Sequence, residues 1–185
     1  MLEPFYKFAS PVALNPAKSL LFSQFGSEFT LDTKFAEVFA RLREVFPYPV
    51  WLHCLIPPLS LVDTKSLPRH HATNSIIVID ILTDKPMTYA QRKHILNKRL
   101  PVLGINTQPL MGHAYTSPTV PESHGMELSY CLENLREDHD WAKMYSGIVA
   151  KKLSSPYDIY PQPATATASR CSLFWHYHPF SAPSA

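Results

Sequence analysis

One stretch of the chain constrains its fold more than any other, the run Ser-Ile-Ile-Val-Ile-Asp-Ile at residues 75–81. Four consecutive β-branched residues lead into a single carboxylate, Asp80, and polar residues flank the run on both sides. An apolar run of this length between polar residues is typical of a strand that is buried on both faces. A carboxylate in such a strand must be solvated, paired or bound to a metal. Asp80 is therefore either a strand end that faces water or part of a functional site.

The composition fits one globular domain. The chain has 185 residues, which is enough for a substantial core, and its 18 prolines against 5 glycines indicate many extended connections. We place the domain at residues 1–160. The low-complexity run at 161–169 is expected to be a linker, and the aromatic tail up to residue 185 has no assignment. A net charge of +2 permits an acidic partner such as nucleic acid without requiring one.

Several classes of protein are excluded by what the sequence lacks. No window resembles a membrane span, and the N-terminus has no signal-peptide pattern, so we expect a cytoplasmic protein with no membrane partner. The 3 cysteines are widely spaced and form no Cys-x-x-Cys pair. Neither a disulfide framework nor a cysteine-based zinc site is therefore expected.

The spacing of apolar residues predicts the elements around the 75–81 strand. We expect helices at 32–46 and 123–137, a strand early in 47–62, and possible strands at 102–106 and 112–117. Residues 87–100 are expected to form a short basic helix or a loop, and residues 1–30 short irregular elements. This order predicts an α+β fold in which helices flank a mixed or antiparallel sheet.

Four segments carry residues suited to chemistry. His113 follows Gly112 beside a predicted strand, and it is either structural or a ligand contact. Asp138 and Asp140 enclose a histidine just past a predicted helix, in a triplet that fits either a divalent ion or a solvated turn. Two basic segments fit either solvated faces or phosphate contacts. Their cations are Lys93, Lys98, Arg99, Lys151 and Lys152.

These segments, in this order, resemble one known family. The apolar strand ending in Asp80, then Asn106 and Gly112-His113-Ala114, then a helix, then Tyr145-Ser146-Gly147-Ile148 with Lys151 following, is similar to the plasmid replicases. Those replication initiators belong to the archaeo-eukaryotic primase superfamily. The resemblance covers about residues 74–160, and the Tyr-Ser-Gly segment is its most specific part.

The resemblance implies a primase-polymerase-like core that makes primers by metal-dependent nucleotidyl transfer. Asp80, Asp138 and Asp140 would hold Mg²⁺ or Mn²⁺, because such transfer needs metal ions to neutralise the phosphates. His113 would contact the incoming nucleoside triphosphate and act in catalysis with Asp80 and Asp140. The phosphates of a single-stranded template or origin DNA would be bound by the two basic segments together with Tyr145 and Ser146.

The chain departs from the family pattern at three positions. Leu82 stands where the family has a second aspartate, Tyr115 where it has a second histidine, and Ala142 where it has a third acidic residue. These replacements leave open whether the chain is an enzyme. The alternative is a catalytically inactive DNA-binding or protein-interaction domain that retains the fold, and a further alternative is an unrelated domain.

Overall fold

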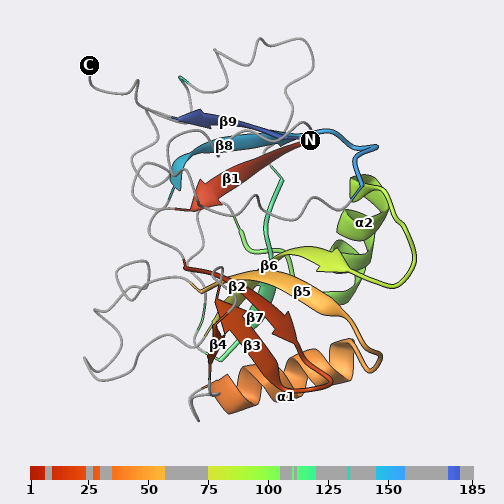
Figure 1. Ribbon diagram of the computed structural model, residues 1–185. Coiled ribbons are helices and arrows are strands. Elements are labelled where there is room, and N and C mark those ends of the chain that lie inside the picture. Colours follow the sequence, from red (N-terminus) through yellow and green to blue (C-terminus); the bar gives the residue numbers. More distant parts are fainter. Residues whose placement is uncertain are drawn as a thin grey trace, which may run out of the picture.

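Within its described residues, the computed structural model of the chain has two sheets and the helices α1 and α2 (Figure 1). It describes residues 1–6, 10–23, 27–29, 35–56, 75–104, 110, 112–119, 133, 145–156 and 175–179. The predicted α+β class, with helices flanking a mixed sheet, is confirmed. No helix in these ranges is long and apolar enough to span a membrane.

The larger sheet has six strands in the order β4-β3-β2-β5-β6-β7. Its strands are β2 (Ser10–Asn15), β3 (Leu20–Ser23), β4 (Glu28–Phe29), β5 (Trp51–Ile56), β6 (Ile76–Leu82) and β7 (Ala114–Thr116). Neighbours are antiparallel except for β6 and β7, which run parallel. The predicted strand at 75–81 is β6, and its residues from Ile76 to Ile81 are at most 8% exposed.

The smaller sheet joins the two ends of the chain. It consists of β1 (Leu2–Tyr6), β8 (Tyr145–Lys151) and β9 (Trp175–Pro179) in the order β1-β8-β9, with both pairs antiparallel. The N-terminal region therefore contains regular strands where irregular elements were expected. The unassigned aromatic tail supplies β9, which lies against β8.

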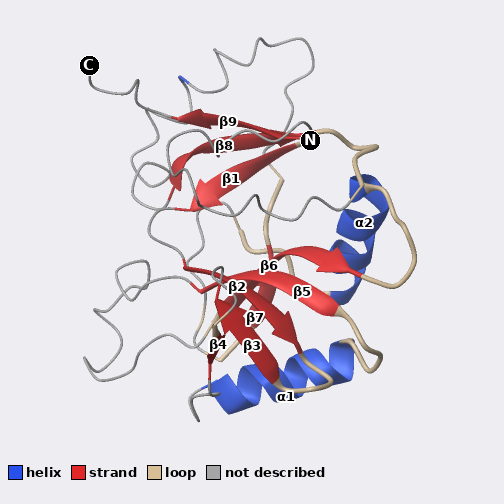
Figure 2. Ribbon diagram, in the orientation of Figure 1, coloured by secondary structure: helices blue, strands red, loops and turns tan. Residues whose placement is uncertain are grey.

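Two helices accompany the larger sheet. Helix α1 (Ala36–Val45) buries Val38, Phe39 and Leu42 against the sheet. Helix α2 (Tyr89–Arg99) begins at a capping box, in which Thr88 and Gln91 satisfy each other's backbone amides. Figure 2 shows α1 lying along one face of the sheet and α2 standing beside it, near the turn that follows β8.

The main core lies between α1 and the larger sheet, and it also includes Leu96 of α2 and Leu100, which follows that helix. Residues 102–106 do not form the predicted strand in the described part, where Val102 makes one bridge to Thr116. The helix predicted at 123–137 and the linker at 161–169 lie outside the described residues, apart from helical Glu133.

Candidate functional site

Asp80 faces away from the main core because β6 contains a bulge. Val78 pairs with Cys54 and Asp80 pairs with His53, so Ile79 has no partner on β5. The extra residue shifts the alternation of side chains. Ile76, Val78 and Ile81 consequently belong to the apolar core, whereas Asp80 projects from the opposite face beside His53.

The Asp80 carboxylate is bound by the guanidinium of Arg92 on α2. Arg92 Nε donates to Oδ1 at 2.7 Å and Nη2 donates to Oδ2 at 3.1 Å, while the backbone amide of Ile81 also donates to Oδ1 at 2.8 Å. Both partners are nearly inaccessible, with side-chain exposures of 11% for Asp80 and 3% for Arg92. Asp80 and Arg92 therefore form a buried, bidentate ion pair.

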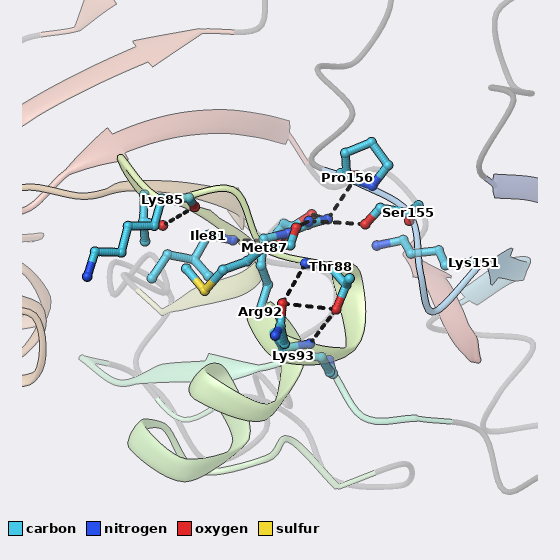
Figure 3. A network of polar contacts seen from close by, with 12 residues as sticks. Ile81, Lys85, Met87, Thr88, Arg92, Lys93, Lys151, Ser155 and Pro156 are labelled. Carbon is cyan, nitrogen blue, oxygen red and sulfur yellow. Dashed lines mark hydrogen bonds and ion pairs between the residues drawn. The ribbon is translucent and has the colours of Figure 1, made fainter.

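Arg92 also binds backbone carbonyls from two segments. Nη1 donates to Met87 O at 2.7 Å and to Ser155 O at 3.4 Å, and Nη2 donates to Pro156 O at 3.3 Å (Figure 3). An arginine has five N–H donors, and these contacts with Asp80 and the three carbonyls use all of them. Arg92 therefore fixes β6, the start of α2 and the turn after β8 relative to one another.

The turn after β8 also closes the N-terminus of α2. The backbone amide of Tyr89 donates to Ser155 O at 2.8 Å, and that of Ala90 donates to Leu153 O at 3.0 Å. Amides in the first turn of a helix have no partner within the helix. The turn supplies those partners, so Lys151 and Lys152 are held next to α2.

A second buried ion pair lies beside the first. The Lys93 ammonium contacts Glu3 Oε1 at 2.6 Å, and the Lys151 ammonium contacts Glu3 Oε2 at 2.9 Å. Lys151 also lies 4.7 Å from the centroid of the Tyr89 ring. Glu3 on β1 is thereby joined to α2 and β8, and the polar cluster spans the space between the two sheets.

The ionisation states of this cluster follow from burial and charge. Burial alone would raise the pKa of Glu3, but the charges of Lys151 and Lys93 outweigh it and lower the pKa to about 2. Burial lowers the pKa of His53 to about 3, and the charge of Lys151 adds to this effect. Burial raises the pKa of Tyr89 well above its usual range, and the charge of Glu3 contributes. At neutral pH, Glu3 is thus charged while His53 and Tyr89 are neutral.

The predicted metal site does not fit the side chains around Asp80. Both oxygens of the Asp80 carboxylate accept a hydrogen bond from Arg92, and the positive charge of this guanidinium repels a metal cation. Across the described ranges, no group of three or more His, Cys, Asp or Glu side chains lies close enough together to hold a metal ion. Asp138 and Asp140, the other predicted ligands, lie outside the described residues.

His113 and Asp80 are not brought together. His113 precedes Ala114, which pairs with Ile76, whereas Asp80 is four residues further along β6, about 13 Å at the usual rise of a strand. His113 Nδ1 instead lies 3.0 Å from Arg41 Nη1, and Arg41 Nη2 donates to Glu37 Oε1 at 2.8 Å. In the described contacts, His113 is part of a surface cluster with α1.

Gly112 is needed for its backbone conformation. Its φ is +75°, a left-handed value that favours glycine. A Cβ at this position would lie 3.3 Å from Glu37 Oε2. The glycine thus lets the chain pass close to α1, and this contact explains it without a ligand.

The predicted phosphate-binding residues fall into two groups. Lys98, Arg99 and Lys152 are exposed. Lys93 is 1% exposed, and its ion pair with Glu3 places it inside the protein, so the prediction that Lys93 faces nucleic acid is wrong. Lys151 is 18% exposed and is shared between Glu3 and the Tyr89 ring.

The Tyr-Ser-Gly segment lies within β8. Tyr145 is fully buried, Gly147 pairs with Phe5 and Pro179, and the side chain of Ser146 lies outside the described part. The described contacts of this segment are those of a central strand in the smaller sheet.

The sequence did not single out Arg92, Glu3 or His53. Arg92 lies among other cations in a basic segment, and charge alone does not distinguish the inward-facing cations from the outward-facing ones. Helical spacing offered one weak signal, because Arg92 and Lys93 precede the buried Leu96 by four and three residues. Glu3 is far from its partners in sequence, so no local pattern marks it.

Comparison with known proteins supports the fold. No protein-family model and no curated protein sequence matches the chain. Among solved structures, the chain is similar to the ligase domain from M. tuberculosis LigD, with a TM-score of 0.57 and 15% sequence identity. The match covers 96% of this chain and 52% of that one, so the chain spans about half the length of its structural neighbour. The described α+β architecture is therefore one that a ligase domain also uses.

Proposed function

We propose that the chain is a nucleic-acid-binding domain on a nucleotidyltransferase-type fold, and that the exposed cations Lys98, Arg99 and Lys152 bind the phosphates. The observation that carries this proposal is the fold shared with a ligase domain over 96% of the chain. Lys98, Arg99 and Lys152 are exposed, and none of them forms an ion pair with a carboxylate in the described part of the chain. Unpaired surface cations are the groups that contact a phosphate backbone.

The contacts of the Asp80 carboxylate favour a domain that binds nucleic acid over one in which this carboxylate takes part in catalysis. Arg92 and Ile81 already donate to both oxygens of the carboxylate. Releasing Asp80 to another ligand would leave a buried guanidinium without its counter-ion, which costs several kcal/mol. This part of the chain therefore acts as a structural support for the exposed cations on α2 and after β8.

Salt-dependent binding tests the proposal. The affinity of the intact chain for DNA should fall as salt rises, because each phosphate contact releases a counter-ion. Lys98→Ala and Lys152→Ala should each make the plot of log binding constant against log salt concentration less steep, by about 0.7 to 0.9 in slope. Lys18→Ala is the matched control, since Lys18 is exposed on the turn between β2 and β3. Binding that is absent, or that does not respond to salt, would overturn the proposal.

A second candidate is the finer function implied by the plasmid-replicase resemblance, a replication initiator that synthesises primers. It is favoured by the succession of Asp80, His113 and the Tyr145-Ser146-Gly147 segment along the chain. It requires nucleotide incorporation on a single-stranded template that depends on Mg²⁺ or Mn²⁺ and is lost in Asp80→Asn. The stability of that variant must be measured in parallel, because the substitution also removes the partner of Arg92. A chain that binds template and incorporates no nucleotide would exclude this candidate and leave the binding function intact.

A further inference from the structure

The solvent-facing side of α2 carries cations that no carboxylate in the described part of the chain neutralises. The helix from Tyr89 to Arg99 contains no acidic residue. Its two inward cations, Arg92 and Lys93, are neutralised by Asp80 and Glu3. The outward cations at its C-terminal end, Lys98 and Arg99, have no carboxylate partner among the described residues.

Arg99 is held in a fixed position against two aromatic rings. Its Nη1 donates to Val45 O, at the end of α1, at 2.6 Å. Its guanidinium carbon lies 5.7 Å from the centroid of the Phe46 ring and 5.2 Å from that of Tyr48. Phe46 is fully buried, whereas Tyr48 is 36% exposed. The remaining N–H donors of Arg99 have no protein partner in the described part of the chain.

We propose that Tyr48, Arg99 and Lys98 form a contact surface for single-stranded nucleic acid. A base stacks on the exposed part of the Tyr48 ring, and the neighbouring phosphates bind the Arg99 guanidinium and the Lys98 ammonium. An exposed aromatic ring beside a fixed guanidinium suits this partner, since every base offers a flat face whatever the sequence of the strand. This inference rests on the proposed function and adds to it the strandedness of the partner and a residue that contacts bases.

The choice of single strands follows from the position of the ring. In a duplex the bases are stacked on one another, so a tyrosine beside the helix α2 surface reaches only phosphates and sugars. In a single strand an unpaired base can leave its neighbours and stack on an aromatic side chain. Tyr48 should therefore contribute to single-strand affinity alone, whereas Lys98 and Arg99 should contribute to both.

The test compares ring-removing and ring-keeping variants at Tyr48. Fluorescence anisotropy with a labelled oligothymidylate should show a loss of about tenfold in affinity for Tyr48→Ala, and little change for Tyr48→Phe. Tyr48→Leu keeps an apolar side chain without the aromatic face and should behave like Tyr48→Ala. Affinity for a duplex of the same length should be the same in all four proteins. Leu110→Ala, at another exposed apolar residue, is the matched control.

The outcomes separate this inference from the function on which it rests. If Tyr48→Ala and Tyr48→Leu bind oligothymidylate as tightly as the natural chain, while Lys98→Ala still lowers the salt slope, the stacking surface is wrong and the binding function stands. If the natural chain binds neither single strands nor duplex at low salt, both are wrong. Thermal unfolding of each variant shows whether Phe46 packing survives, and Tyr48→Leu remains informative if Tyr48→Ala is unfolded.

Discussion

Arg92 illustrates how one side chain can determine the role of another. Asp80 has the position and chemistry of a metal ligand when only its own strand is considered. The guanidinium turns it into an internal counter-ion, because two parallel hydrogen bonds and an opposite charge occupy the carboxylate. A lysine at the same position would offer a point charge without the planar fork that reaches Asp80 and three carbonyls together.

Removing either partner of this pair should destabilise the protein strongly. We expect Arg92→Ala to lower the free energy of unfolding by about 3–5 kcal/mol, since it leaves a buried carboxylate uncompensated. Arg92→Lys should recover only part of the loss. Urea unfolding followed by circular dichroism measures both. Lys98→Ala, an exposed cation of the same helix, should stay within about 0.5 kcal/mol of the natural chain. A loss below about 1 kcal/mol for Arg92→Ala would show that the pair is solvated.

Glu3 and His53 should make the protein sensitive to acid. The pKa of Glu3 is lowered to about 2 in the folded protein, so the unfolded chain takes up a proton first and stability falls as the pH drops from about 4.5 towards 2. His53, with its pKa lowered to about 3, makes stability fall between about pH 6.5 and 3 for the same reason. Above pH 7 neither group affects the pH dependence.

These two pH ranges can be separated by substitution. His53→Gln should remove most of the decline in unfolding free energy between pH 6.5 and 4.5. Glu3→Gln should remove the contribution of this carboxyl to the decline below pH 4.5, about 3 kcal/mol in total, and leave the contribution of His53, which continues to about pH 3. It should also lower stability at pH 7, because Lys93 then loses its counter-ion. Urea unfolding at a series of pH values gives both curves. A His53→Gln curve that overlays that of the natural chain would contradict the assignment.

Helix α2 is stabilised at its start by more than its own sequence. The capping box satisfies the amides of Thr88 and Gln91, and the carbonyls of Ser155 and Leu153 accept from the amides of Tyr89 and Ala90 that lie between them. The turn after β8 therefore behaves as a cap supplied from elsewhere in the chain. In isolation the helix would lack these partners and would be frayed at this end.

Hydrogen exchange measures this external cap directly. We expect the amides of Tyr89 and Ala90 to exchange slowly, although amides in the first turn of a helix usually exchange fast. Arg92→Lys should accelerate both, because it loosens the carbonyls of residues 155 and 156. The amide of Leu96, in the middle of the helix, is the internal reference. Rapid exchange at Tyr89 and Ala90 in the natural chain would mean that the turn does not dock.

Local signals explain which elements the sequence predicts. The helix at 32–46 and the strand at 75–81 carry long, regular apolar patterns, and they correspond to α1 and β6. The strands in residues 1–30 are short, and β1 and β2 pair with β8 and β5, which are distant in sequence. Their alternation of side chains is therefore too brief to identify them from the sequence alone. The bulge at Ile79 is equally invisible in sequence. It nevertheless decides whether Asp80 faces the apolar core or the polar cluster.

At the scale of the whole molecule, β8 links segments that are far apart in the chain. It lies between β1 and β9, and its last residue, Lys151, leads directly into the turn that docks on α2. The smaller sheet therefore depends on the tail, which the sequence alone left without a role. A chain that ends before residue 175 would leave one edge of β8 unpaired.

Truncation should therefore produce a protein prone to self-association. An unpaired strand edge offers free amides and carbonyls to another chain. We expect residues 1–174 to melt at a lower temperature than the full chain and to elute from size-exclusion chromatography as larger species as concentration increases. The full chain carrying Tyr177→Pro, which removes one β9 amide, should show a milder form of both effects. A truncated chain that stays monomeric with an unchanged melting temperature would show that β9 is dispensable.

The pairing of β1 with β8 also has a consequence for the order in which the protein folds. Leu2 pairs with Ala150, so β1 cannot pair fully until residue 150 has been made. At about 5–20 residues per second, the ribosome needs roughly 7–30 seconds to synthesise the intervening segment. Contacts of such long separation form slowly in refolding as well. Lys151, one of the two cations that pair with Glu3, is made only at the end of this interval, so the cluster that joins the two sheets is among the last parts of the protein to assemble.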